Sequence, residues 1–275
     1  MEYRTLAGIS TADIHDAFVD AFGSYEVPMS LSVTELTAMM DSRDVSLTLS
    51  VGCFDADTLV GFVLVGVRDG AHGCVTYDAA TGVRQGHQNK GIGSGLLHAL
   101  WAQLRAAGAV SFQLEVLENN TAAQTLYERH GCTTTRRFVC VRTQRSPDRR
   151  LPPGWELRSA LPAGIDEALY NGYVPSWQQA VASARGAYFV VRTEGSVVVA
   201  YGIINATSGS VMQLGIHPDW RWTIPVAEVV QAVASQTNSD QLRFVNIEDA
   251  SWMASALLEY GWEPFVYQRE MMRAL

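Results

Sequence analysis

The stretch "VRQGHQNKGIGSGLLHALWAQL", Val83 to Leu104, places three glycines directly before a run with helical periodicity. Beyond the glycines, apolar residues recur at intervals of three and four, which predicts an amphipathic helix over about 92–107. Glycine lacks a Cβ, so a turn containing Gly91, Gly93 and Gly95 lets backbone N–H groups approach a ligand closely. At a helix N-terminus such donors, together with the positive end of the helix dipole, favour a bound phosphate or pyrophosphate.

Two other phosphate-binding motifs use glycine-rich turns, and neither fits this stretch. A Walker loop has the form G-x-x-x-x-G-K-[ST], whereas here Lys90 precedes Gly91. A dinucleotide-binding fingerprint has the spacing G-x-G-x-x-G inside a parallel β-α-β unit, whereas this stretch reads G-x-G-x-G and follows a predicted antiparallel meander. The remaining alternative is a glycine-rich turn that merely connects a strand to a helix.

Outward from the turn, hydrophobic periodicity predicts a mixed α/β sheet with helices on its faces. Upstream we expect a strand at 2–6, helices at 10–22 and 32–42, and strands at 46–54, 58–68 and 73–83. Downstream of the helix at 92–107 we expect the strand "SFQLEVL", a helix at 120–130 and the strand "TTRRFVCV".

The second half of the chain repeats this order in a weaker form, with a period of about 130 residues. Between the halves, the segment 144–158 is rich in proline and charge and has no hydrophobic period, which is typical of a linker. A length of 275 residues also suits two domains. We therefore expect a first domain at 1–145, a linker at 146–154 and a second domain at 155–275.

Composition excludes several classes of protein. The formal charge is -8, and the mid-chain arginines occur without any base-reading motif, so we expect a solvated surface and no nucleic-acid partner. The four cysteines and six histidines lack metal-ligand spacing, which predicts reduced thiols and no metal. No signal-peptide pattern and no run of about 18 apolar residues is present, so we expect a cytoplasmic protein without a membrane span.

The glycine turn resembles the signature [QR]-x-x-G-x-[GA] of the GNAT superfamily of acyl-CoA-dependent N-acetyltransferases. Its context fits, because it follows a meander and opens a helix. The resemblance implies two GNAT-fold domains and acetyl-CoA as cosubstrate, with the turn amides holding the coenzyme A pyrophosphate and the end of the preceding strand pairing with the pantetheine arm. The residues that it assigns to the coenzyme are Gly82, Val83, Gln88, Asn89, Lys90, Gly91, Ile92, Gly93 and Ser94.

A second stretch, "LEVLENNTAAQTLYERHGC" at Leu114–Cys132, resembles another pattern of the family, with Cys132 in place of the usual Phe. The resemblance implies that Tyr127 protonates the leaving thiolate, although a tyrosine at this helical spacing could also be a core residue. In the relatives that acetylate protein N-termini, a glutamate twelve residues before this tyrosine is the base, so the resemblance implies that Glu115 could deprotonate the amine. The alternatives are a buried, hydrogen-bonded strand residue at Glu115, with the base on another strand or a water molecule. Asn120 either contacts the coenzyme or caps a helix, and both uses coexist in the family.

The acceptor pocket of the superfamily includes the loop between the first two helices and the strand that leads into the turn. Here these are the segments 23–32 and 76–82. The polar and aromatic groups that could bind an amine are Tyr25, Glu26, Tyr77 and Asp78. The alternative is that Tyr25 and Glu26 lie on an exposed loop and bind no ligand.

The second copy departs from both patterns. "IHPDWR" at 216–221 aligns with "VRQGHQ" at 83–88, but Trp222–Val226 then replaces Asn89–Gly93, so both glycines are lost and a proline removes an amide. Leu257 stands opposite Tyr127, so the phenol is also missing. We expect a degenerate domain without acetyl-CoA chemistry.

These patterns together predict a tandem GNAT enzyme whose N-terminal domain transfers an acetyl group to a primary amine, by direct attack in a ternary complex. A small-molecule acceptor is favoured, and a protein N-terminus or lysine is the alternative. A non-catalytic, acyl-CoA-binding regulatory protein is the rival from another class, and the retained Tyr127 argues against it. For the second domain we expect packing on the active domain, closure of the acceptor pocket or an oligomer contact, such as that of a homodimer.

Overall fold

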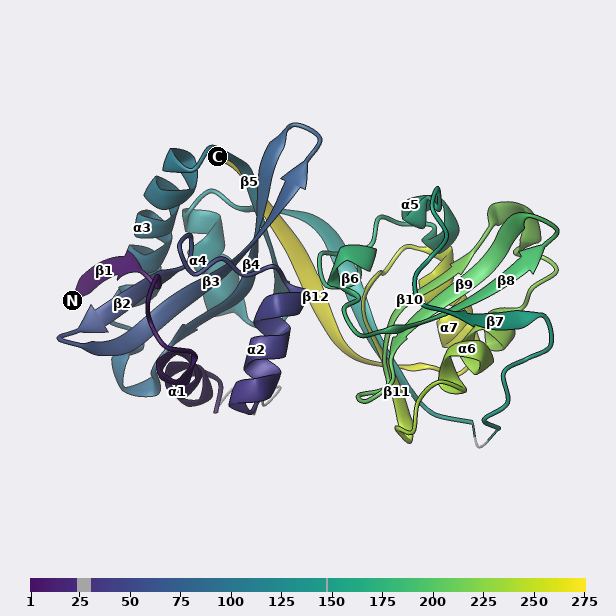
Figure 1. The fold of residues 1–275 in the computed structure, drawn as a ribbon. Helices are drawn as coiled ribbons and strands as arrows, with labels where there is room; N and C mark the ends of the chain where they lie inside the picture. Colours follow the sequence, from purple (N-terminus) through teal and green to yellow (C-terminus); the bar gives the residue numbers. More distant parts are fainter. Residues whose placement is uncertain (24–30, 147) are drawn as a thin grey trace. The chain divides into compact units, whose positions relative to one another are not determined.

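The computed structural model describes residues 1–23, 31–146 and 148–275 of the chain. It divides into two compact units, which are considered separately (Figure 1). The first unit comprises Met1–Thr135 together with Glu270–Leu275, and the second comprises Arg136–Arg269.

The bounds of these units differ from the contiguous domains expected from the sequence. Residues 136–145 lie in the second unit and residues 270–275 lie in the first. The cause is that two strands, β6 (Thr133–Gln144) and β12 (Glu263–Ala274), each have residues in both units. Periodicity detects such strands but not the sheet that they join. The expected linker at 146–154 includes residue 147, which lies outside the described residues.

The first unit follows the predicted order of elements closely. These elements are β1 (Glu2–Thr5), α1 (Thr11–Phe22), α2 (Val33–Ser42), β2 (Val51–Asp55), β3 (Thr58–Gly70), β4 (Gly73–Val83), α3 (Ile92–Ala106), β5 (Ala109–Leu117) and α4 (Thr121–Arg129). Strands β1 to β4 pair antiparallel, and β4 pairs with β5 in parallel. The mixed sheet with flanking helices confirms the predicted fold class.

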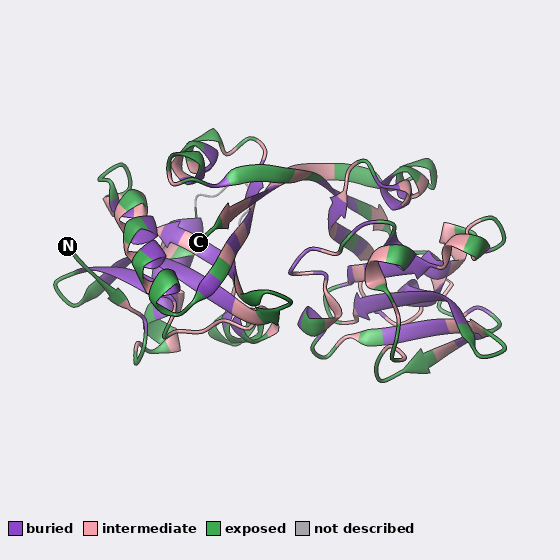
Figure 2. Ribbon diagram, turned by 90° about the horizontal axis from the view of Figure 1, so that it is seen from above, coloured by how far each residue is buried: buried purple, intermediate pink, exposed green. Residues whose placement is uncertain are grey.

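The apolar stripe of α3 covers the sheet, as its periodicity requires. Leu96, Leu97, Leu100 and Leu104 are fully buried, and the Trp101 ring lies edge-on to that of Phe112 on β5, with 5.0 Å between centroids. Buried residues are concentrated in the strands and on the inner faces of the helices (Figure 2). The last residues of β12 join this core, since Met271 is fully buried within it.

The two parallel strands of the first unit pair over only part of their length. The register runs from Cys74–Ala109 to Tyr77–Gln113, whereas β4 continues to Val83 and β5 to Leu117. Opposite β3, a bulge leaves Ala79 without a register partner. Beyond Tyr77 and Gln113 the two strands continue without a paired register, and we call this unpaired region the opening between β4 and β5. The candidate site lies there.

The second unit has the strand and helix order of the first, except that one α-helix, α5, stands where the first unit has α1 and α2. Its elements are β7 (Trp155–Arg158), α5 (Glu167–Asn171), β8 (Tyr188–Glu194), β9 (Val197–Asn205), β10 (Ser210–Ile216), α6 (Val226–Ala234), β11 (Gln241–Glu248) and α7 (Trp252–Glu259). Here too the middle strands are antiparallel, and β10 pairs with β11 in parallel.

Two expectations about elements were wrong. The strand expected at 46–54 begins only at Val51, because the residues before it form turns, with Ser50 N donating to the Ser46 carbonyl at 2.9 Å. The short helix α5 was not predicted. Its five residues are too few to show helical periodicity, although Asp166 caps it by accepting from Leu169 N at 3.1 Å.

Candidate active site

The glycine turn ends in a helix whose N-terminus is open. Gly91 is the N-cap of α3 and has a left-handed φ of 77°, and no side chain caps this end. Asn89 also has a positive φ, of 60°. Gly95 N donates the first bond of the helix to the Gly91 carbonyl at 3.0 Å, so the amides of 92–94 precede the regular bonding pattern. These donors and the space around Gly91 fit a pyrophosphate.

Only one of the three glycines is explained by the conformation of the turn. A Cβ on Gly91 would meet no atom within 4 Å, but its φ disfavours any side chain. A Cβ on Gly93 would lie 3.0 Å from Leu126, and one on Gly95 would overlap the Tyr3 hydroxyl at 2.1 Å. Gly93 and Gly95 are therefore explained by the packing of α3 against α4 and β1, a reason that the sequence did not suggest.

The polar side chains of the turn bond to the turn itself. Gln88 Nε2 donates to the Val83 carbonyl at 3.2 Å, and Lys90 Nζ donates to the Gly86 carbonyl at 2.7 Å. Both bonds hold the chain in the shape that presents its amides.

Tyr127 on α4 and Asp78 on β4 meet in the opening between the parallel strands. The Tyr127 hydroxyl donates to Asp78 Oδ2 at 2.9 Å, and the Thr81 hydroxyl donates to the same oxygen at 2.6 Å. The other oxygen, Asp78 Oδ1, is buried and has no hydrogen-bond partner among the described residues. Tyr127 and Asp78, 49 residues apart, thus form one buried pair.

Burial changes the acidity of both groups. Desolvation raises the pKa of Asp78 to about 6, against the opposing effect of the bonds from Thr81 and Tyr127. The pKa of Tyr127 is raised well above its ordinary value, first by burial and then by the charge of Asp78. The phenol therefore carries its proton at neutral pH, as a proton donor must.

A second pair lies where the opening begins, at the last residue of β4 that is in register with β5. Tyr77 on β4 donates its hydroxyl hydrogen bond to Glu115 Oε2 on β5. Burial, followed by the charge of Glu115, raises the pKa of Tyr77 well above its ordinary value. The candidate base Glu115 therefore lies in the same opening as Tyr77, while Asn120 caps α4 by accepting from Ala123 N at 3.1 Å.

Some site residues were missed or lie outside the described part of the chain. Arg43 donates to the Ala79 carbonyl at 2.6 Å, and its charge lowers the pKa of Asp78. Neither Arg43 nor Thr81 belongs to a motif, so no sequence pattern could have identified them. Tyr25 and Glu26 fall outside the described residues, and Gly82 and Val83 end β4 opposite Phe62 and Gly61 of β3.

The described part of the chain contains neither a metal-binding cluster nor a membrane-spanning helix. No group of three or more His, Cys, Asp or Glu side chains in them is arranged to hold a metal ion. Within the same residues, every helix is too short or too polar to cross a membrane.

Solved structures share the fold over nearly the whole chain. A GCN5-related N-acetyltransferase from Sphaerobacter thermophilus is 15% identical with a TM-score of 0.70, covering 99% of this chain and 95% of that one. A tandem GNAT protein from the clavulanic acid biosynthesis pathway is 14% identical with a TM-score of 0.68, covering 99% of this chain and 98% of that one. The glucosamine N-acetyltransferase region of a fungal multi-domain GH3 beta-N-acetylglucosaminidase is 13% identical with a TM-score of 0.72, covering 99% of this chain and 38% of that one.

At these identities the structures establish the fold alone, and the search of curated proteins found no match. The family follows from the sequence of the first unit, where the model of the acetyltransferase (GNAT) family matches residues 12–132. The first unit therefore contains a domain of the acetyltransferase (GNAT) family, over residues 12–132.

Proposed function

We propose that this protein transfers an acetyl group from acetyl-CoA to the primary amine of a small molecule, and that the first unit alone carries the reaction. The observation that carries this proposal is the buried Tyr127–Asp78 pair in the opening between β4 and β5. Tyr127 shares a core cluster with Ile92, the first residue of α3, whose N-terminus has no side-chain cap. This arrangement combines a proton donor with an anion-binding helix end.

In the proposed reaction the amine attacks the thioester carbonyl directly in a ternary complex. An amine with an ordinary pKa of about 10 must first lose a proton, and Glu115 is the base that we propose. A C–N bond then forms and the C–S bond breaks as the intermediate collapses. Tyr127 donates its proton to the departing thiolate.

Asp78 influences whether Tyr127 can give up its proton. A phenolate left beside an ionised Asp78 would bring two negative charges together in a buried site, which is unfavourable. Donation is therefore easier when Asp78 is protonated, and its pKa of about 6 makes that form accessible near neutral pH. Asp78 is also a second candidate for the base, because Oδ1 has no partner among the described residues.

Two features of the second unit support a structural rather than a catalytic role. Pro225 is the N-cap of α6, and no side-chain bond caps this end, where the glycine turn would be. Between β10 and β11, Gln179 bridges the two strands: its Nε2 donates to the Val245 carbonyl, and its own carbonyl accepts from Gln213 Nε2 at 2.8 Å. The chain itself thus links the strands that correspond to β4 and β5.

The decisive experiment measures acetyl-CoA consumption with a panel of amines, polyamines, aminoglycosides, amino acids and N-terminal peptides. Turnover with a small amine supports the proposal, whereas turnover with peptides alone would favour a protein acceptor. Tight acetyl-CoA binding without turnover across the panel would instead favour a regulatory protein.

Glu115→Gln and Asp78→Asn distinguish the two candidate bases. The true base should lose about a hundredfold or more in kcat when it becomes an amide, since general base catalysis contributes rates of that order. The other variant should keep most of its activity. Equal, small effects of both would point to a water molecule as the base.

A further inference from the structure

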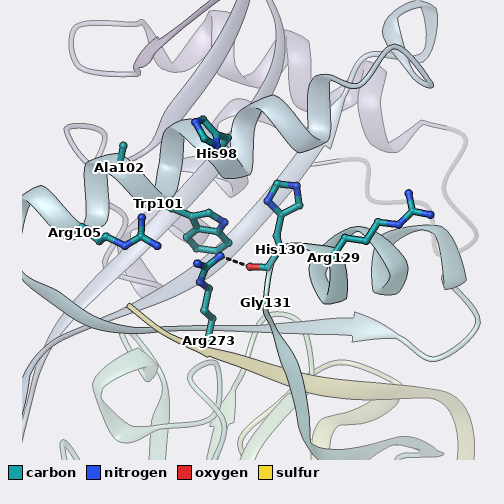
Figure 3. Close-up of a pocket in the computed structure, with 8 residues that line it drawn as sticks. All are labelled: His98, Trp101, Ala102, Arg105, Arg129, His130, Gly131 and Arg273. Carbon is teal, nitrogen blue, oxygen red and sulfur yellow. Dashed lines mark hydrogen bonds between the residues drawn. The ribbon is translucent and has the colours of Figure 1, made fainter.

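A pocket of positive character lies on the first unit, outside the groups used above. Its volume is about 570 Å³. It lies between α3, the end of α4 and the last residues of β12 (Figure 3). The side chains that give it its character are His98, Trp101, Arg105, Arg129, His130 and Arg273.

The charge of this pocket is opposite to that of the whole chain. Three guanidinium groups line it and no carboxylate does, although the chain carries a formal charge of -8. Among the described residues, no carboxylate lies within ion-pair distance of Arg105, Arg129 or Arg273. Three unpaired cations around one cavity favour an anion between them.

One of these cations is held in place by its neighbours. Arg273 Nη1 donates to the His130 carbonyl, and the guanidinium lies 4.6 Å from the centroid of the Trp101 ring. Figure 3 shows Arg273 stacked against Trp101 beside His130. Burial, and then the charges of Arg273 and His98, lower the pKa of His130. Its Nε2 lies 2.7 Å from Ser94 Oγ, in the first turn of α3.

We propose that this pocket binds a phosphate monoester dianion. Guanidinium groups bind phosphate oxygens with paired hydrogen bonds, and Arg105 and Arg129 are exposed and available for this. The Ser94–His130 contact connects the pocket to the helix end that fits a pyrophosphate. The bound phosphate group could therefore be the 3′-phosphate of coenzyme A, an assignment that rests on the proposed function. Alternatively, the phosphate group belongs to a separate phosphorylated small molecule.

The test compares coenzyme A with 3′-dephospho-coenzyme A by titration calorimetry. The variants are Arg105→Gln/Arg129→Gln and, as a control with the same change in charge, Arg158→Gln/Arg243→Gln on exposed positions of the second unit. If the 3′-phosphate is the ligand, the wild type and the control bind coenzyme A about tenfold more tightly than the dephospho form, as for a charge-assisted hydrogen bond. The pocket variant loses this preference.

The second arm needs no coenzyme. Thermal unfolding is measured with inorganic phosphate and with chloride at equal ionic strength. If a separate ligand is bound, phosphate raises the Tm of the wild type and the control but not of the pocket variant, with no preference for coenzyme A over its dephospho form.

If neither the preference nor the phosphate effect depends on Arg105 and Arg129, the proposal is overturned. These arginines would then serve only to stabilise the ends of α3 and α4 through the helix dipole. A chain that binds no coenzyme A would contradict the proposed function, whereas the phosphate arm would still decide the pocket.

Discussion

At the scale of single residues, the contact between Tyr127 and Asp78 has the most direct consequence for chemistry. Tyr127→Phe removes only the hydroxyl that donates to Asp78 Oδ2. We expect kcat to fall about a hundredfold or more, because a general acid contributes rates of that order. Acetyl-CoA affinity, measured by titration calorimetry, should stay within about threefold, since the phenol is not part of the helix end. Unchanged turnover would exclude Tyr127 as the acid.

Asp78 also makes stability depend on pH. Its folded pKa, about 6, lies above the ordinary value of 3.8, so the folded state binds the proton more tightly. This contribution to stability is complete below pH 3.8 and is lost as the pH rises through 6. The free energy of unfolding that is lost in this way is about 3 kcal/mol at most.

Asp78→Asn should remove this pH dependence. Relative to the wild type, the variant should gain unfolding free energy between pH 4 and pH 7, measured by urea denaturation at each pH. Parallel pH profiles for the two proteins would show that Asp78 is not destabilised by burial.

At the scale of elements, two glycines next to the site should respond differently to alanine. A Cβ on Gly82 would lie 2.8 Å from Phe62 and 2.9 Å from Ala21, both in the core, so Gly82→Ala should cost about 1–3 kcal/mol of stability. The Cβ of Gly91→Ala would meet no atom within 4 Å, but the alanine must adopt a left-handed φ. We expect this to cost about 1 kcal/mol of stability.

The difference between the two variants should appear in coenzyme binding. Gly91→Ala places a methyl group where the amides of the turn face a ligand, so acetyl-CoA affinity should fall by more than the loss of stability explains. Gly82→Ala keeps the backbone groups that would pair with the pantetheine arm, so we expect it to lower Tm more than it lowers affinity. The opposite pattern would remove Gly91 from the binding site.

At the scale of the whole molecule, the first unit depends on the end of the chain. Met271 is fully buried in the core of this unit, and Leu275 N donates to the Val110 carbonyl at 3.2 Å. Met271→Ala should therefore cost about 2–5 kcal/mol, seen as a lower urea midpoint together with lost activity. The exposed substitution Ala274→Ser is a control that should change neither.

The number of coenzyme sites is a second property of the whole molecule. We expect one acetyl-CoA per chain in a calorimetric titration, because only the first unit combines the glycine turn with the phenol. Two equivalents per chain would contradict the proposed role of the second unit.

The sequence by itself determined the order of elements apart from α5, the position of the open helix end and the difference between the two copies. These features are local: periodicity, glycine spacing and a proline are visible within one short stretch. It also identified Tyr127 and Glu115 as a candidate acid and base through a family pattern.

Only the tertiary structure paired Tyr127 with Asp78, brought Arg273 beside Trp101 and placed residues 270–275 in the first unit. It also supplied a packing reason for the absence of a side chain at Gly93 and Gly95. The physical reason is that each of these features depends on side chains far apart in the chain. Their contacts and burial, and hence their pKa values, exist only once the sheet has formed.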